Sequence, residues 1–383
     1  MIEIVEKERC CGCSACYSAC SHNAINMVFD DEGFEYPIIN QDTCVDCGLC
    51  KTSCPVLRYD YEERKNYSDV QKGFAARNKN YKQRLTSSSG SIFPVIAEYI
   101  IEHGGIVVGV SYDENFNAHH QIVDKIEDLY HLQGSKYLQC NSDNSTYKKI
   151  RSELNTGRLV LYSAMACQIE GLKSYLRKDF DNLYTIDLIC MGIPSPKVWQ
   201  IYLRSFFKGE KIKHVNFKEK SMGWDNFCFH LETNKRTFKE RGMKNLYLQS
   251  MFHTWNMRRS CFNCPFKKAE RISDFTIADC WGVSNFVPQI NDNKGLSSVI
   301  VHSSKGLALW ENLKNRMDSV EILIDEIAKG NTNLISNKPE LPGREEFYEL
   351  LHYKPKKAFS TLCSDNVSFL KRVVGKCMTL LRL

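Results

Sequence analysis

Two runs of cysteine near the N-terminus constrain the fold of this chain more than any other feature of its sequence. Each run has the spacing Cys-x2-Cys-x2-Cys-x3-Cys, and a proline follows the second run. The eight residues are Cys10, Cys13, Cys16, Cys20, Cys44, Cys47, Cys50 and Cys54. So many thiols in a short segment indicate cross-linking, either by disulfides or by bound metal.

Iron–sulfur ligation fits this spacing better than disulfides or zinc. The spacing is typical of bacterial ferredoxins. Disulfides need an oxidising compartment, and the N-terminal residues MIEIVEKERCC lack the apolar stretch of a signal peptide. Zinc sites usually pair two Cys-x2-Cys knuckles and leave no role for the other cysteines of each run. We therefore predict two 4Fe–4S clusters near the N-terminus.

The ligands of each cluster follow from a feature of two-cluster ferredoxins, in which the fourth cysteine of each run binds the cluster of the other run. The first cluster is expected to bind Cys10, Cys13, Cys16 and Cys54, and the second Cys44, Cys47, Cys50 and Cys20. Cys11 fits neither run, and we interpret it as a bystander.

Charge is distributed unevenly along the chain. Residues 1–60 carry four Lys/Arg against ten Asp/Glu, and the rest of the chain carries 47 against 35 of the totals of 51 and 45. Most of the basic residues are expected on a solvated surface, although a positively charged cleft would concentrate anionic cofactors or substrates. No nucleic-acid-binding motif is present, and no apolar run is long enough to span a bilayer. We expect a cytoplasmic protein without a nucleic-acid partner.

Beyond residue 85, helical and strand patterns alternate, which predicts an α/β (α+β) body with parallel strands. Apolar strands are expected at 105–112, 158–163, 183–189, 296–303 and 320–324. The expected organisation is a ferredoxin domain at 1–58, a linker at 59–84, the body at 85–345 and a helical tail at 346–383. The tail places apolar and basic residues at helical spacing between 367 and 382, which fits packing on the body or peripheral contact with a membrane.

Four cysteines of the body are candidates for a further metal site. Cys167 and Cys190 follow predicted strands, at the sheet edge where α/β proteins collect their sites. Cys261 and Cys264 form a Cys-x2-Cys pair flanked by arginine and lysine, whose charge favours thiolates. Four ligands suffice for a third 4Fe–4S cluster. A zinc knuckle at the pair, with two structural thiols elsewhere, is the alternative.

Two polar features accompany these cysteines. The loop SSSGS at 87–91 opens a helix, and its small residues would leave backbone N–H groups free for a phosphate, although helix capping alone is the common role. The segment SDFTIADCWG at 273–282 predicts a strand followed by a turn, in which Asp279 and Trp281 are distinctive. A strand-end cap is the ordinary role of such an aspartate.

In their order along the chain, these motifs resemble the coenzyme F-420 hydrogenase/dehydrogenase beta-subunit family over about residues 70–315. The motifs are SSSGSIFPVIAEYI, GSKY, CQI, DLICMGIPSP, KSMGW, SCFNCPF, SDFTIADCWG and NKGLSSVIVHSSKG. The resemblance implies an FAD-containing iron–sulfur flavoprotein that passes electrons from a ferredoxin-like redox partner to a small organic acceptor. A link to surface-polysaccharide metabolism is an extension of this resemblance.

The resemblance also implies roles for individual residues. The expected flavin contacts are Ser89, Gly90, Ser91, Gly134, Ser135, Lys136 and Tyr137. The expected ligands of a third cluster are Cys167, Cys190, Cys261 and Cys264.

The chain departs from the family pattern at positions that matter for catalysis. Ala164-Met165-Ala166 replaces Gly-Thr-Pro, Met191 replaces a histidine, Ser91 replaces a glycine, and Cys280 replaces an aromatic residue. Met191 cannot transfer a proton, so an acid/base step assigned to that histidine is lost or moved. No catalytic residue is predicted. The alternative function is a non-catalytic electron-transfer subunit that feeds a partner enzyme.

Overall fold

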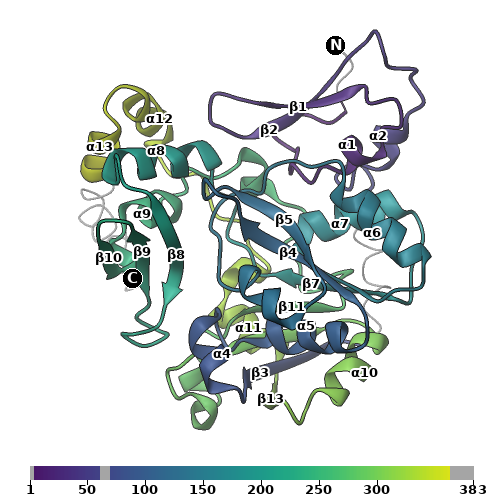
Figure 1. The fold of residues 1–383 in the computed structure, drawn as a ribbon, viewed down its shortest axis with the longest axis vertical. Coiled ribbons are helices and arrows are strands. Elements are labelled where there is room, and N and C mark those ends of the chain that lie inside the picture. Colours follow the sequence, from purple (N-terminus) through teal and green to yellow (C-terminus); the bar gives the residue numbers. More distant parts are fainter. Residues whose placement is uncertain (1–3, 61–69, 363–383) are drawn as a thin grey trace, which may run out of the picture.

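A computed structural model describes residues 4–60 and 70–362 of the chain. These residues contain a two-stranded, a three-stranded and an eight-stranded sheet. In Figure 1 the N-terminal module with the two-stranded sheet lies at the top, against the body that holds the other two sheets. The architecture is thus a mixed α/β body preceded by a small module.

Each cysteine run of the N-terminal module contains a short helix. Its elements are α1 (Ala15–Ala19), β1 (Ile25–Phe29), β2 (Glu35–Ile39) and α2 (Leu49–Thr52). The helices follow residues with positive φ, Ser14 at 63° and Gly48 at 70°. The strands pair antiparallel, and α1 contacts α2. The repeated cysteine spacing therefore adopts a repeated local conformation.

The eight-stranded sheet forms the centre of the body. Its strands are β3 (Lys72–Asn78), β4 (Ile106–Tyr112), β5 (Ala118–Val123), β6 (Val160–Met165), β7 (Leu183–Leu188), β11 (Phe275–Asp279), β12 (Ser297–Val301) and β13 (Met317–Ile322). Their order is β13-β3-β12-β11-β7-β6-β4-β5. The central strands β4, β6, β7 and β11 are parallel, and the remaining pairings are antiparallel. The parallel core was expected, and the mixed edges were not.

Helices cover both faces of this sheet. They are α5 (Ile92–Glu102), α6 (Thr146–Asn155), α7 (Ala166–Leu176) and α10 (Ser304–Asn312). α5 and α10 bury Ile96 and Trp310 against one face, with Leu161 of β6. α6 and α7 bury their apolar residues against the other face, with Tyr162 of β6. Successive residues of β6 thus enter opposite cores, which explains its continuous apolar sequence.

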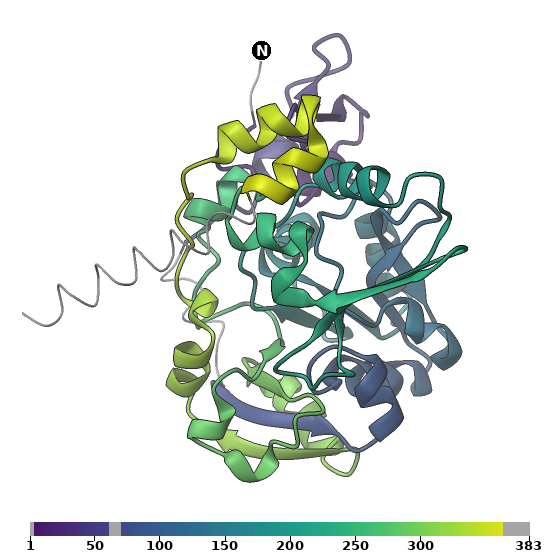
Figure 2. The same cartoon turned by 90° about the vertical axis from the view of Figure 1, so that its left-hand side faces the viewer.

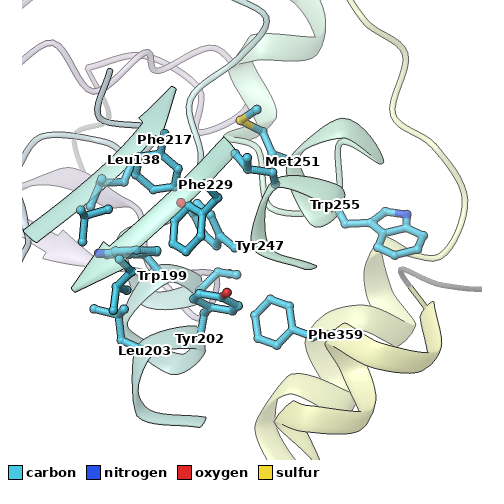
Figure 3. Close-up of a cluster of buried hydrophobic side chains, with 14 of the residues drawn as sticks. Leu138, Trp199, Tyr202, Leu203, Phe217, Phe229, Tyr247, Met251, Trp255 and Phe359 are labelled. Carbon is cyan, nitrogen blue, oxygen red and sulfur yellow. The ribbon is translucent and has the colours of Figure 1, made fainter. Parts of the chain in front are cut away.

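The three-stranded sheet and five helical segments enclose a separate aromatic core. These elements are α8 (Pro196–Phe206), β8 (Ile212–Glu219), β9 (Cys228–Thr233), β10 (Thr237–Arg241), α9 (Leu246–Phe252), α12 (Arg344–Tyr353), α13 (Pro355–Lys357) and η7 (Ala358–Leu362). In this core the ring centroid of Trp199 lies 4.9 Å from that of Tyr247 and 5.2 Å from that of Phe217 (Figure 3). Figure 2 shows the C-terminal helices, in yellow, beside the N-terminal module.

Short elements complete the described fold. They are α4 (Tyr81–Thr86), η1 (Ile126–His131), η2 (Gly242–Lys244), η3 (Arg259–Asn263), η4 (Val283–Asn285), η5 (Pro288–Ile290), α11 (Ile324–Gly330) and η6 (Thr332–Leu334). In the part of the chain that the structure describes, no helix has both the length and the apolar composition needed to cross a bilayer. The amphipathic pattern predicted at 367–382 lies outside the described residues.

The predicted linker at 59–84 contains a strand of the central sheet. β3 lies between β12 and β13. Gly73 in β3 approaches its neighbour so closely that an added Cβ would lie 2.6 Å from the carbonyl oxygen of Ile322. Ala75 and Ala76 are fully buried. Because the strand is built from small residues that fit between close neighbours, it lacks the bulky apolar pattern by which the other strands were predicted.

Truncation in the aromatic core should destabilise the body strongly. Phe229 is fully buried, with its ring centroid 5.3 Å from that of Phe217. We expect Phe229→Ala to lower the free energy of unfolding by about 3–5 kcal/mol, because it removes buried apolar contacts and leaves a cavity. Urea denaturation measures the change. Tyr353→Ala is the control, since Tyr353 is 74% exposed, and equal effects of the two substitutions would contradict the assignment of this core.

Candidate functional site

A cavity of about 580 Å³ lies at the carboxyl edge of the parallel strands. Its wall includes the last residues of β6, β7 and β11, together with residues of α9 and of the N-terminal module. Parallel strands direct their carboxyl ends to the same edge, and ligands of α/β proteins commonly bind there. The volume is within the range of small-molecule and cofactor sites.

Five of the seven predicted flavin contacts line this cavity. They are Ser89, Gly134, Ser135, Lys136 and Tyr137. The hydroxyl oxygens of Ser88 and Ser135 are 2.9 Å apart, which joins the loop before α5 to the GSKY segment. The structure therefore brings together two motifs that are far apart in the sequence.

The other two predicted flavin contacts lie behind the cavity wall. Gly90 donates its backbone N–H to the Ser297 hydroxyl at 2.9 Å, and an added Cβ would lie 2.3 Å from the carbonyl oxygen of Ala76. Ser91 is buried and precedes α5 with a φ of 62°. Both residues shape the loop that presents Ser89 to the cavity.

Asp279, at the end of β11, connects three parts of the cavity wall. Its carboxylate accepts hydrogen bonds from the Ser89 hydroxyl at 2.6 Å, the Trp224 indole N–H at 2.7 Å and the Lys218 ammonium at 2.9 Å. Burial alone would raise the pKa of Asp279, but the Lys218 charge and the hydrogen bonds outweigh burial and lower this pKa. Asp279 therefore holds the site together, which is more than the strand-end role expected from the sequence.

Two lysines line the cavity in different electrostatic states. The Lys218 ammonium lies 4.7 Å from the ring centroid of Trp281, and pairing with Asp279 raises its pKa although burial opposes the charge. The Lys136 ammonium donates to the carbonyl oxygens of His131 at 3.0 Å and Gln133 at 2.7 Å. Burial lowers the pKa of Lys136 to about 7. Lys218 is thus a fixed cation, whereas Lys136 can change its protonation near neutral pH.

The four body cysteines converge beside the same cavity. Cys167 lies in the first turn of α7, Cys190 follows β7, and Cys261 and Cys264 lie in and just after η3. Burial raises the pKa of Cys264 to about 12, and the neighbouring thiols of Cys261 and Cys190 contribute to this rise. Burial and Cys261 likewise raise the pKa of Cys190 to about 12. Thiols that influence one another in this way are close in space.

Cys11, interpreted as a bystander from the spacing, lies where the module meets the body. The neighbouring thiols of Cys13 and Cys167 lower the pKa of the Cys11 thiol, and Cys11 lines the cavity. The sequence contained no signal for this position, because the contact joins two segments that only the tertiary structure brings together.

The cysteines of the two N-terminal runs lie close together in the module. Cys20, Cys44, Cys47 and Cys50 together line a small cavity of about 40 Å³. Cys16 lies within electrostatic range of Cys10, Cys54 and Cys50. Cys13 faces α7, where its sulfur would lie 2.9 Å from a Cβ added to Gly171. The crossed ligand sets remain a prediction from the spacing, since Cys50 lies near Cys16 as well as near Cys20 and Cys44. All 16 described cysteines are free of disulfides.

A buried arginine fastens this module to the body. Arg258 is fully buried and donates to the Cys10 carbonyl oxygen at 2.7 Å, the Glu35 carbonyl oxygen at 3.0 Å and the Gln139 side-chain oxygen at 3.0 Å. One of its N–H groups also points to the Cys10 sulfur at 3.6 Å. The basic residues before Cys261 gave a sequence signal for positive charge here, but not for this contact.

Three of the six positions that depart from the expected family pattern lie in the cavity wall. Ala164, Met165 and Met191 line it. The backbone carbonyl of Met191 accepts a hydrogen bond from the Lys267 ammonium at 2.9 Å. Because the Met191 side chain cannot transfer a proton, the groups of the wall that carry exchangeable protons include Lys136, Tyr137 and Lys218.

Removing the charge of Asp279 should destabilise the cavity wall. We expect Asp279→Asn to lower the free energy of unfolding by about 3 kcal/mol, because Lys218 would remain buried without its counter-ion. Thermal and urea unfolding measure the loss. Asp225→Asn is the matched control, since Asp225 lines the same cavity but is exposed. A loss equal to that of the control would show that the ion pair with Lys218 does not stabilise the wall.

Comparison with known proteins assigns both parts of the chain. Residues 157–323 match the family model that describes the C terminus of the coenzyme F420 hydrogenase/dehydrogenase beta subunit, and residues 9–57 match the 4Fe–4S dicluster domain. A solved F420-reducing NiFe hydrogenase complex from Methanosarcina barkeri aligns over 76% of this chain and 90% of that chain, with 15% identity and a TM-score of 0.43. No curated protein sequence matches the chain. The resemblance predicted from the motifs is confirmed: residues 9–57 belong to the 4Fe–4S dicluster domain family, and residues 157–323 belong to the family of C-terminal domains found in the beta subunits of coenzyme F420 hydrogenases and dehydrogenases.

Proposed function

We propose that this protein is an iron–sulfur flavoprotein oxidoreductase that passes electrons from a ferredoxin-like donor protein, through 4Fe–4S clusters, to FAD and an organic acceptor. The observation that carries the proposal is the shared cavity. Cys11, Cys167 and Cys190 line it together with the Ser89 loop and the segment 134–137. A single chamber thus joins thiols suited to iron–sulfur ligation with loops suited to a nucleotide cofactor.

Three groups of cysteine would hold the clusters. The outer group (Cys20, Cys44, Cys47 and Cys50) would hold the outer cluster. The inner group (Cys10, Cys13, Cys16 and Cys54) would hold the inner cluster, and the body group (Cys167, Cys190, Cys261 and Cys264) the body cluster. Each group offers four thiols, the ligand number of a 4Fe–4S cluster. Cys47 is exposed, whereas Cys10 is buried beside Arg258. The outer group is therefore the accessible one, and the inner group is next to the body.

FAD fits the chemistry of the cavity wall. The hydroxyls of Ser88 and Ser135 are placed to hydrogen-bond a polar cofactor, and Lys218 supplies positive charge. The loop before α5 lies at the N-terminus of an 11-residue helix, a favourable place for a phosphate. When bound, a flavin supplies the conversion between one-electron and two-electron chemistry.

The residues of the wall would orient the acceptor and supply protons. The Asp279 network fixes Lys218 as a cation beside Trp281. Lys136, whose pKa is lowered to about 7, can give and take a proton near neutral pH. We assign it as the candidate proton donor, because Met191 cannot fill that role. Cluster cysteines need a reducing compartment, which supports a cytoplasmic location.

Anaerobic reconstitution of the full chain with iron, sulfide and FAD tests the proposal. Three clusters predict about twelve iron atoms per chain, at four for each cluster. Bound flavin is expected at about one per chain. An iron content well below about eight atoms per chain would show that the N-terminal module does not bind two clusters. Absence of bound flavin would remove the flavoprotein assignment.

The body cluster is tested by single substitutions. We expect Cys190→Ala and Cys261→Ala each to lower the iron content by about four atoms per chain while leaving the signals of the N-terminal clusters. Cys140→Ala is the matched control, since Cys140 lines the same cavity outside the body group. Iron analysis and EPR spectroscopy measure the result. Unchanged iron content in both variants would show that the four cysteines are structural thiols and bind no cluster. Bound zinc would support a zinc knuckle at Cys261 and Cys264.

A second candidate function is electron transfer to a partner enzyme without a substrate site of its own. The observation that favours it is the presence of Met191 and Ala164 in the cavity wall. The chain would then reduce no small acceptor but would turn over with its partner protein. Reoxidation of the reduced flavin with quinones, nitro compounds and sugar-derived acceptors distinguishes the two functions, and the sugar-derived compounds test the link to surface polysaccharides.

A further inference from the structure

Arg258 contacts the inner cysteine group in a way that has no counterpart in the outer group. Its guanidinium donates to the Cys10 carbonyl oxygen at 2.7 Å and points an N–H to the Cys10 sulfur at 3.6 Å. Cys20 of the outer group accepts a hydrogen bond from the uncharged backbone N–H of Ala24 at 3.3 Å. Among the described residues, the hydrogen bonds to the outer sulfurs include none from the side chain of an arginine or a lysine.

The surroundings of Arg258 hold its charge in place and exclude water. Its guanidinium lies 4.1 Å from the ring centroid of Tyr36 and 5.5 Å from that of Phe34. Gly12 has a φ of 67°, and a Cβ added there would lie 2.5 Å from the Gln139 amide nitrogen and 3.0 Å from the central guanidinium carbon. Glycine at position 12 therefore allows the arginine to approach the backbone of the first cysteine run.

A fixed cation with an N–H directed at a cysteine sulfur favours the reduced state of an iron–sulfur cluster. Reduction adds one negative charge, and both the positive charge and the hydrogen bond stabilise that added charge. The effect is large where water is excluded, since the local dielectric constant is low. The inner group has this arrangement, whereas the outer group lies nearer the surface.

We propose that Arg258 raises the reduction potential of the inner cluster above that of the outer cluster, and so makes the inner cluster the point from which electrons enter the body. This inference rests on the cluster assignments of the proposed function. In the step concerned, one electron leaves the reduced outer cluster and arrives at the oxidised inner cluster. No covalent bond forms or breaks, and the electron comes originally from the ferredoxin-like donor. Arg258 acts here as a positioning residue through Cys10.

The position of the inner group suits a difference in reduction potential between the two clusters. Cys11 adjoins Cys10 in the chain, and it lines the cavity together with Cys167 of the body. Cys11 therefore lies between the inner cluster and the body group, on the path that an electron would take. A higher potential at the inner cluster would draw electrons from the exposed Cys47 side toward the cavity.

Redox titration followed by EPR, on the anaerobically reconstituted full chain, tests this inference. In wild type the inner cluster should be reduced at a higher potential than the outer cluster, whose signal is identified by its loss in Cys47→Ala. Arg258→Gln should lower the inner potential relative to the outer by a tenfold change in the reduction equilibrium, about 59 mV for one electron. Arg258→Lys keeps the positive charge but loses the planar set of guanidinium N–H donors, so we expect a smaller shift of the inner potential.

Arg259→Gln is the matched control. It removes a neighbouring positive charge and the ion pair with Glu32 at 3.1 Å, at the same boundary between module and body, and we expect no change in the difference between the two potentials. If Arg258→Gln does not assemble its clusters, the difference between the two reduction potentials is measured in Arg258→Lys instead. An unchanged difference in the Arg258 variants, or an equal change with Arg259→Gln, overturns the inference while leaving the clusters in place. A wild-type protein without both clusters overturns the inference and the cluster assignments together.

Discussion

The burial of one arginine determines how the two parts of this protein face each other. A guanidinium taken out of water is costly unless its N–H groups are hydrogen-bonded. Arg258 meets this requirement only when the carbonyl oxygens of Cys10 and Glu35 come from the N-terminal module and the Gln139 oxygen from the body. The same boundary is reinforced by Glu32, which pairs with Arg344 of α12. The orientation that satisfies the arginine also places Cys11 against Cys167.

The second constraint is the direction of the central strands. Because β4, β6, β7 and β11 are parallel, the loops after them collect at one edge, where the cavity lies. Asp279 at the end of β11 then binds Ser89 from the loop before α5 and Lys218 from the three-stranded sheet. The cavity is thus held by one carboxylate that links three elements. Its shape depends on long-range contacts, whereas its position depends on the sheet.

The cavity wall combines thiols with groups that can carry protons. Thiols line it beside two lysines, and a methionine stands where the family pattern has a histidine. The ion pair with Asp279 keeps Lys218 charged, whereas burial lowers the pKa of Lys136 to about 7. Because the Met191 side chain carries no exchangeable proton, the proposed chemistry depends on the proton-carrying groups of the segment 134–137 and of β8.

The sequence by itself determined the cysteine groups, the N-terminal module and the parallel strands, because spacing and apolar runs are local properties. Five of the seven flavin contacts that the family resemblance implied line the cavity. Only the tertiary structure decided the place of β3, whose small residues fit between close neighbours and carry no apolar signal. It also decided the roles of Cys11, Asp279 and Arg258. Their partners lie far away in the chain, and a hydrogen bond between distant segments leaves no periodic pattern in a single sequence.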